Sequence, residues 1–244
     1  MFDITRRGLL QGTAAAVLAS SMAGRAYAGP KRGGNLRIGL AGGTSADSLD
    51  PTATPVDSGF LMLGTARSTL TNIDPKGNVI PNLADSWEPS KDLTQWIFNI
   101  RKGATFHSGK TVTADDVVAS LNLHRGEKSV SPAKALLDPV TKIAADGPNR
   151  VVITLNGPNV EFPSILKTDM LVVLPSKDGV IDRTTKDGTG PYVLETFEPG
   201  QNMRYTRNPN YWDLENYAFL DSAEVVVIAD AAARMNALRS GRVD

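Results

Sequence analysis

Apolar and polar residues alternate along several short stretches of this 244-residue chain, and such alternation is typical of half-buried β-strands. The stretches Asn35 to Leu40 and Gln95 to Arg101 show it most clearly. Further strands are predicted between turns rich in Gly, Pro and Asn, at residues 140–144, 150–155, 192–198, 203–207 and 223–228. The apolar run 170–174 has the length of a buried strand.

Helical signals are interspersed among these strands. Thr113 followed by Asp116 has the form of a capping box, in which the side chains of the first turn bond to backbone N–H groups. Helices are predicted from Gly59 to about Leu70, from Thr113 to His124, after Ser131-Pro132, from Phe162 to Lys167 and from Asp230 to Arg239. This order of elements predicts a mixed α/β or α+β protein with a mixed sheet.

Residues 1–28 have the form of an export signal. Arg6 and Arg7 precede a weakly apolar stretch, and Ala26-Tyr27-Ala28 is a small-x-small cleavage site. The run from Thr5 to Gln11 resembles a twin-arginine export motif. A membrane anchor is the alternative, but the stretch is too polar and too short to span about 30 Å of hydrocarbon. The sequence therefore predicts a product exported from the cytoplasm.

Composition narrows the classes of function. The chain has 26 Lys and Arg against 26 Asp and Glu, so no strongly basic field indicates nucleic acid as a partner. It contains no Cys, which excludes disulfides, thiolate metal sites and a lipidated N-terminal Cys. With two His, a His-rich metal site is not expected. We therefore expect a periplasmic protein that has no lipid anchor.

Catalytic motifs are sparse. His107 and His124 are the ordinary bases of the chain, and each is predicted to have a structural role, in a turn and on the inner face of a helix. Gly188-Thr189-Gly190 lacks the third glycine and the following helix of a dinucleotide-binding motif. Trp96 alternates within a strand and is predicted to be in the core. Trp87 and Trp212 lie in predicted turns, where they would line a cleft or cover a sheet edge.

Several motifs in order resemble the extracellular solute-binding proteins of family 5, the peptide, dipeptide and nickel binders of ABC importers. Each motif alone is weak, but the ordered set is specific and extends along the chain after residue 28. The matching runs are residues 33–39, Leu49-Asp50-Pro51, 77–88, 96–121, the GTGPY turn at 188–192, the RNPNYW turn at 207–212 and the final run 237–244.

The resemblance implies a type II periplasmic-binding-protein fold, with two lobes around a deep cleft. Residues 29–67 and 171–244 would form the split first lobe, and residues 68–170 a smaller subdomain inserted in it. Family members continue well beyond the final motif. We therefore expect the second lobe and the closing C-terminal segment to be missing from this chain.

The resemblance also implies a protein that catalyses no reaction and needs no cofactor or metal. It would capture a small solute, by family default a di- or oligopeptide, and deliver it to ABC permease subunits in the inner membrane. When full length, it would be a monomer. First-lobe ligand contacts would fall in the loop Thr54-Pro55-Val56-Asp57 and near Pro132-Ala133. Pro55 and Ala133 lack the acidic and aromatic side chains that some peptide binders carry there.

Two other functions stay open from the sequence. One is a nickel or haem binder of the same family, which the low His content disfavours. The other is an exported hydrolase, which would need a nucleophile and an orienting group within hydrogen-bond reach of His107 or His124.

Overall fold

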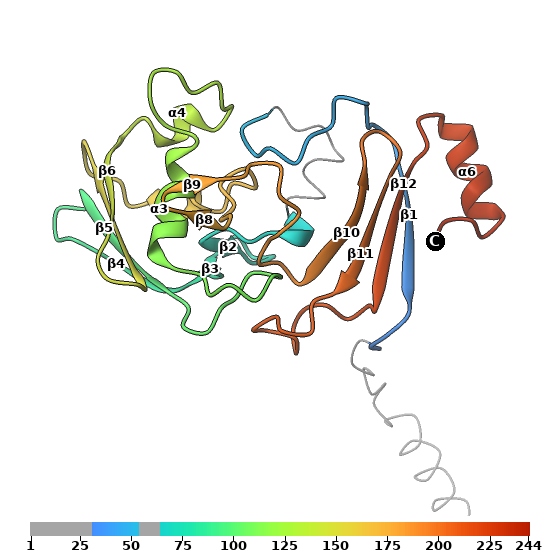
Figure 1. Cartoon of the computed structure of the whole chain (residues 1–244), viewed down its shortest axis with the longest axis horizontal. Helices are drawn as coiled ribbons and strands as arrows, with labels where there is room; N and C mark the ends of the chain where they lie inside the picture. Colours follow the sequence, from blue (N-terminus) through green and yellow to red (C-terminus); the bar gives the residue numbers. More distant parts are fainter. Residues whose placement is uncertain (1–30, 54–63) are drawn as a thin grey trace, which may run out of the picture. The chain divides into compact units, whose positions relative to one another are not determined.

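The computed structural model describes residues 31–53 and 64–244, and Gly33–Asp244 form one compact unit (Figure 1). Its labelled strands are β1 (Asn35–Leu40), β2 (Thr71–Ile73), β3 (Val79–Pro81), β4 (Ala84–Pro89), β5 (Gln95–Ile100), β6 (Val140–Ala145), β7 (Arg150–Leu155), β8 (Ser176–Lys177), β9 (Val180–Ile181), β10 (Tyr192–Glu198), β11 (Asn202–Arg207) and β12 (Ser222–Val227). Its labelled helices are α3 (Ala114–Asn122), α4 (Lys134–Leu137), α5 (Phe162–Ile165) and α6 (Ala231–Arg239).

The first sheet has the strand order β1-β12-β11-β10. β1 pairs in parallel with β12, whereas the other two pairings are antiparallel, so the predicted mixed sheet is confirmed. β10 and β11, both predicted as strands, form a hairpin around Pro199-Gly200. Asp230 accepts a hydrogen bond from the Ala233 N–H at 2.7 Å and caps α6, which packs against β1.

The second sheet is antiparallel, with the order β4-β5-β7-β6, and α3 packs against it. Alternation along β5 places Trp96, Phe98 and Ile100 in a large core, which confirms the prediction for Trp96. Trp87 lies in β4 and not in a turn, so that expectation was wrong. The pairing of β4 with β5 extends over 84–89, although this segment has no clear alternation.

Two further expectations were wrong. The helix predicted to reach Leu70 ends by Ala66, and its predicted start at 59–63 lies outside the described residues. Residues 67–70 are instead bonded to other segments, as when Ser68 N–H donates to Thr189 Oγ1 at 3.2 Å. The run 170–174 is buried from Leu171 onward but is not a strand, because its N–H groups bond to separate partners such as the Ser120 hydroxyl.

The chain passes between the two sheets along neighbouring segments, 66–68 and 187–191. Gly190 N–H donates to the Ala66 carbonyl at 3.0 Å, and the Ser68 hydroxyl donates to the Thr189 carbonyl at 3.3 Å. A Cβ on Gly190 would lie 2.5 Å from the carbonyl carbon of Ala66, so this close approach requires glycine. We call these two segments the crossing.

The sequence motifs at the two ends of the unit bind each other. The carboxylate of Asp244 accepts hydrogen bonds from the backbone N–H of Arg37 at 2.9 Å and from its Nη2 at 2.9 Å. The carboxylate of Asp221 accepts from the N–H of Gly34 at 3.0 Å and pairs with Arg207. These motifs therefore fasten β1 into the first sheet.

Candidate functional site

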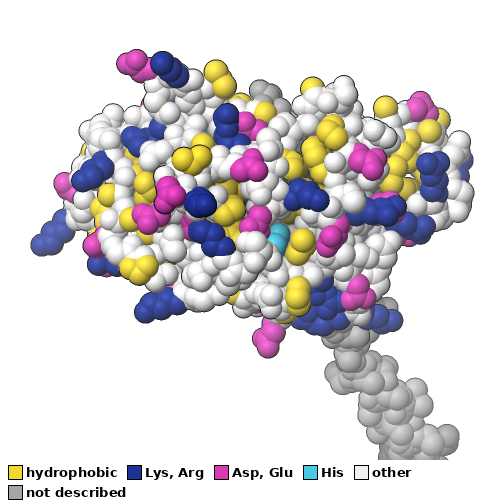
Figure 2. Space-filling view, viewed as in Figure 1, with side chains coloured by type: hydrophobic (Ala, Val, Ile, Leu, Met, Phe, Trp, Pro, Cys, Tyr) yellow, Lys and Arg dark blue, Asp and Glu magenta, His cyan; other side chains and the backbone are white. Residues whose placement is uncertain are grey.

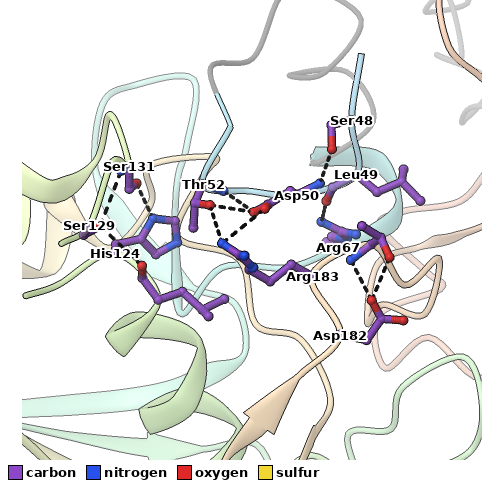
Figure 3. Close-up of polar contacts among 12 residues, drawn as sticks. Ser48, Leu49, Asp50, Thr52, Arg67, His124, Ser129, Ser131, Asp182 and Arg183 are labelled. Carbon is purple, nitrogen blue, oxygen red and sulfur yellow. Dashed lines mark hydrogen bonds and ion pairs between the residues drawn. The ribbon is translucent and has the colours of Figure 1, made fainter. Parts of the chain in front are cut away.

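A polar cluster lies where the loop after β1 meets the loop before β10 (Figure 3). Asp50 Oδ1 accepts hydrogen bonds from the N–H and the hydroxyl of Thr52, at 2.8 and 2.7 Å. Arg183 Nη1 lies 3.3 Å from Asp50 Oδ2 and 3.1 Å from Thr52 Oγ1. In this way Asp50 both shapes its own loop and holds one side of an arginine.

A second arginine of the cluster, Arg67, is buried. Its two terminal nitrogens donate to the carbonyls of Leu49 and Thr185, each at 2.7 Å. Burial lowers the pKa of Arg67 to about 10, and the negative charges of Asp50 and Asp182 oppose that shift. Because both partners are backbone carbonyls of different loops, Arg67 has a structural role, which is to tie the loops together.

His124 lies just after α3 and is fully buried. Its Nδ1 is 2.6 Å from the hydroxyl oxygen of Ser131, which also accepts a hydrogen bond from the Ala133 N–H at 3.1 Å. The Ser131 hydroxyl hydrogen is thus available to donate to Nδ1 of a neutral ring. Burial lowers the pKa of His124 to about 4, with Asp50 acting in the opposite direction.

The contact between His124 and Ser131 bears on the hydrolase alternative, because it joins a base to a hydroxyl near Asp50. Both residues are buried, and the Ser131 oxygen is already engaged with the start of α4. A ring whose pKa is about 4 is a weak base at neutral pH. His107 is engaged at the crossing, where its Nε2 lies 3.1 Å from the Gly190 carbonyl oxygen. Neither histidine thus has the geometry of an accessible general base.

The predicted ligand contacts fall at two places. Thr54, Pro55, Val56 and Asp57 lie outside the described residues. Pro132 is exposed, whereas the methyl group of Ala133 is buried in the core of the second sheet. Pro132 and Ala133 sit on the Ser131 side of the cluster, and the described loop ends at Ala53, one residue after Thr52.

Sequence reasoning missed Arg67 and Arg183. Arg67 lay inside a segment predicted to be helical, and Arg183 lay in a loop to which no motif was assigned. Asp50 was noticed as part of Leu49-Asp50-Pro51, but its partners are far away in sequence. Neither arginine stands in a local sequence pattern that would have pointed to its partners.

A broad groove of about 810 Å³ lies between α3 and the β8–β9 hairpin. The buried carboxylate of Asp116 faces it but is already bonded to Lys110 Nζ, to the Thr113 N–H and to the Ser176 N–H. These bonds hold the pKa of Asp116 below its usual value although burial opposes them. The group therefore fastens α3 to its surroundings. The Thr113 and Asp116 part of the predicted capping box is confirmed.

The surface does not single out a charged partner. Figure 2 shows acidic and basic side chains interspersed over most of the visible face. Among residues 31–53 and 64–244, no group of three or more His, Asp or Glu side chains is arranged to hold a metal ion. No helix in this described part has the length and apolar character to cross a membrane.

The comparison with protein families decides the identity. Residues 78–244 match the family described as "Bacterial extracellular solute-binding proteins, family 5 Middle". The chain belongs to this family. The expectation of a family 5 solute-binding protein, drawn from the motifs of the sequence, is thus confirmed at the level of the family.

Relatives of this family 5 protein bind different solutes according to their names. The "Peptidoglycan-binding protein YepA" of Agrobacterium fabrum is 29% identical over 88% of this chain and 38% of its own length. The structure of AgaA with agropinic acid, from A. tumefacien R10, is 30% identical with a TM-score of 0.78, covering 86% of this chain and 43% of AgaA. Helicobacter pylori DppA with the peptide STSA is 26% identical with a TM-score of 0.76, covering 88% of this chain and 46% of DppA.

These structures confirm the periplasmic-binding-protein fold. The chain spans less than half the length of these relatives, from 38% of YepA to 46% of DppA. The boundaries expected between the split lobe and its inserted subdomain remain predictions.

Proposed function

We propose that this family 5 protein captures a small peptide, or a solute of similar size and polarity, in the periplasm and delivers it to an ABC permease. The observation that carries this proposal is the family match over 78–244 together with the likeness to DppA, whose structure contains a peptide. Agropinic acid in AgaA supports the wider class of small polar solutes.

The contacts of this half of the protein with the solute would come from Thr54 to Asp57 and from Pro132-Ala133. Because the Ala133 methyl group is buried, Pro132 and the backbone around it would provide the second contact. In the whole protein, closure of a second lobe over this surface would bury the solute, and the closed lobes would dock on the permease. The protein would act as a monomer.

Calorimetric titration with a mixed library of di- to pentapeptides and with agropinic acid tests the proposal. We expect binding in the millimolar range, because one wall of a cleft makes about half of the contacts. A second lobe would add the remaining contacts, and on the order of 4 kcal/mol separates millimolar from micromolar binding. An Asp57→Ala variant should bind more weakly still, whereas a Lys142→Ala variant on exposed β6 should not change affinity.

Results contrary to the proposal can be told apart. No heat with any peptide or with agropinic acid, together with saturable binding of nickel or haem, would replace peptide by the other ligand class. Micromolar binding by this chain would keep the function but show that one lobe provides most of the affinity.

We also propose export by the twin-arginine route with cleavage after Ala28. Arg6 and Arg7, followed by a weakly apolar stretch, support it. Replacing both arginines by Lys should stop the appearance of the mature form in the periplasmic fraction. Undiminished export of this double variant would mean another route to the same compartment.

A further inference from the structure

The two arginines of the polar cluster, Arg67 and Arg183, differ in how many of their terminal nitrogens form hydrogen bonds within the protein. Arg67 is 3% exposed and uses both terminal nitrogens on backbone carbonyls. The Arg183 side chain is 49% exposed, and among the described residues its hydrogen bonds and ion pair all involve Nη1. Nε and Nη2 of Arg183 form the edge of the guanidinium that matches a carboxylate in a two-bond geometry.

The ion pair that holds Arg183 is weak, as its distance and its exposure to solvent show. The ion pair with Asp50 involves one nitrogen at 3.3 Å and is half open to solvent. Exposed pairs of this kind contribute little to stability. Arg183 is therefore oriented by Asp50 and Thr52 without being needed to hold the loops together, because Arg67 already does that.

Charges around Arg183 point to an acidic group as its partner. Asp50 and Thr52 contact Nη1 on one side of the guanidinium. The remaining nitrogens can only donate hydrogen bonds, so a partner for them must be an acceptor. The neighbouring His124 is neutral above about pH 4 and does not compete for an anion. In the sequence, the proposed solute contacts Thr54 to Asp57 begin two residues after Thr52.

We propose that Arg183 binds a carboxylate group of the solute through Nε and Nη2, while Asp50 holds Nη1 and weakens that binding by its negative charge. This inference rests on the proposed function and adds to it the chemical class of the solute, a molecule with a free carboxylate. Under this proposal Asp50 helps to set which solutes bind, because its negative charge weakens the binding of a carboxylate to Arg183.

The test is an NMR titration of the whole chain with two matched probes, tetra-alanine with a free C-terminal carboxylate and tetra-alanine amide. Arginine Nε–H signals report directly on the guanidinium, and chemical-shift titrations measure millimolar affinities. We expect the free acid to bind about tenfold or more tightly than the amide, which is the range of a hydrogen bond to a charged group. The Nε–H signal of Arg183 should shift with the acid alone.

Three variants separate recognition from structure. Arg183→Gln should bind the acid as weakly as the amide, whereas Arg204→Gln should behave like the unchanged protein, because Arg204 pairs with Glu224 across β11 and β12. Asp50→Asn keeps an Oδ1 acceptor for Thr52 and should increase affinity for the acid several-fold without affecting the amide. A purely structural role of this ion pair would weaken binding in both Asp50→Asn and Arg183→Gln.

Equal affinity for acid and amide in the unchanged protein would overturn the role of Arg183 and leave the proposed function standing. The same would follow if Arg204→Gln and Arg183→Gln lost equal affinity, or if Asp50→Asn weakened binding of the acid. If neither probe nor any peptide of the library shifted a signal of the cluster, the proposed peptide function would fail, and this inference with it.

Discussion

The two sheets of the unit differ in how completely their apolar faces are covered. The second sheet packs β6 and β7 against α3, and Phe98, Ile153 and Phe162 are fully buried in its core. The first sheet has a much smaller buried set, in which Leu194, Tyr205 and Val225 are prominent. Within the described residues, an apolar hollow of about 170 Å³ lies against its strands.

This difference separates two tasks. The second sheet has its own core and provides most of the stability that burial can give, since stability scales with apolar area removed from water. The first sheet relies more on strand pairing and on polar bonds between its end motifs, such as Arg37 with Asp244. Equivalent substitutions in the two sheets should therefore have unequal effects.

The largest difference should come from a matched pair of phenylalanines. Phe98→Ala should cost about 3–5 kcal/mol of unfolding free energy, because the side chain is fully buried and a cavity would remain. Phe197 on β10 is half-buried, so Phe197→Ala should cost less than half as much. Urea unfolding of both variants measures this, and equal costs would contradict the difference between the sheets.

Lowering the pH should reduce the free energy of unfolding, because His124 is buried in its neutral form. The pKa of this ring is about 4 when folded and near 6.5 when unfolded, so the unfolded state takes up the proton first. Stability is complete above about pH 6.5 and should fall toward pH 4, by on the order of 3 kcal/mol. Burial lowers the pKa of His107 as well, which adds to the loss in the same direction.

A His124→Asn variant, which cannot ionise, provides the control for this pH dependence. Urea unfolding at pH 7.5, 6 and 5 should show a shallower decline for the variant than for the unchanged protein. Parallel declines would assign the acid sensitivity to other groups.

The crossing should be sensitive to a single methyl group. Gly190→Ala should cost about 1–3 kcal/mol, because the new Cβ would meet the backbone of Ala66. Gly157→Ala is the control, since its Cβ would meet nothing within 4 Å and its φ is not positive. Thermal unfolding should separate the two variants, and a neutral Gly190→Ala would show that the two segments can move apart.

The smallest effect should come from the motif contact on the first sheet. Hydrogen bonds from Arg37 hold the pKa of the Asp244 carboxyl below its usual value, so its stabilising effect is present near neutral pH and is lost as acid protonates it. Asp244→Asn should lower the urea midpoint slightly at pH 7 and less at pH 3. A shift of the same size at both values would argue against a charge effect.

Local patterns were enough to predict much of the fold. Alternation predicted β1 and β5, flanking turns predicted β7 and β10, and the Thr113 and Asp116 pattern predicted the start of α3. Predictions failed where tertiary bonds override local preference. Residues 67–70 were predicted to be helical, but their backbone groups bond to Thr189, Leu83 and Ala84. The buried run ending at Leu174 bonds to a side chain on α3.

The site was less predictable than the fold. Asp50 and Arg183 are joined across 133 positions, and Arg67 meets Leu49 and Thr185 from a third segment. Such contacts leave no periodicity in the sequence, since each loop residue looks like an ordinary surface charge. The motif resemblance identified the family, but four of the six contact positions it implied, Thr54 to Asp57, lie outside the described residues.

The crossing has a consequence for how such proteins diversify. Residues 66–68 and 187–191 lie side by side. The segment between them therefore begins and ends at neighbouring positions next to the first sheet. Segments whose ends lie close together are tolerated as insertions, and they can be exchanged without rebuilding the scaffold that holds them. The stretch between residues 69 and 186 could therefore be grafted as one cassette between family members, with the glycines of the crossing as the fixed splice points.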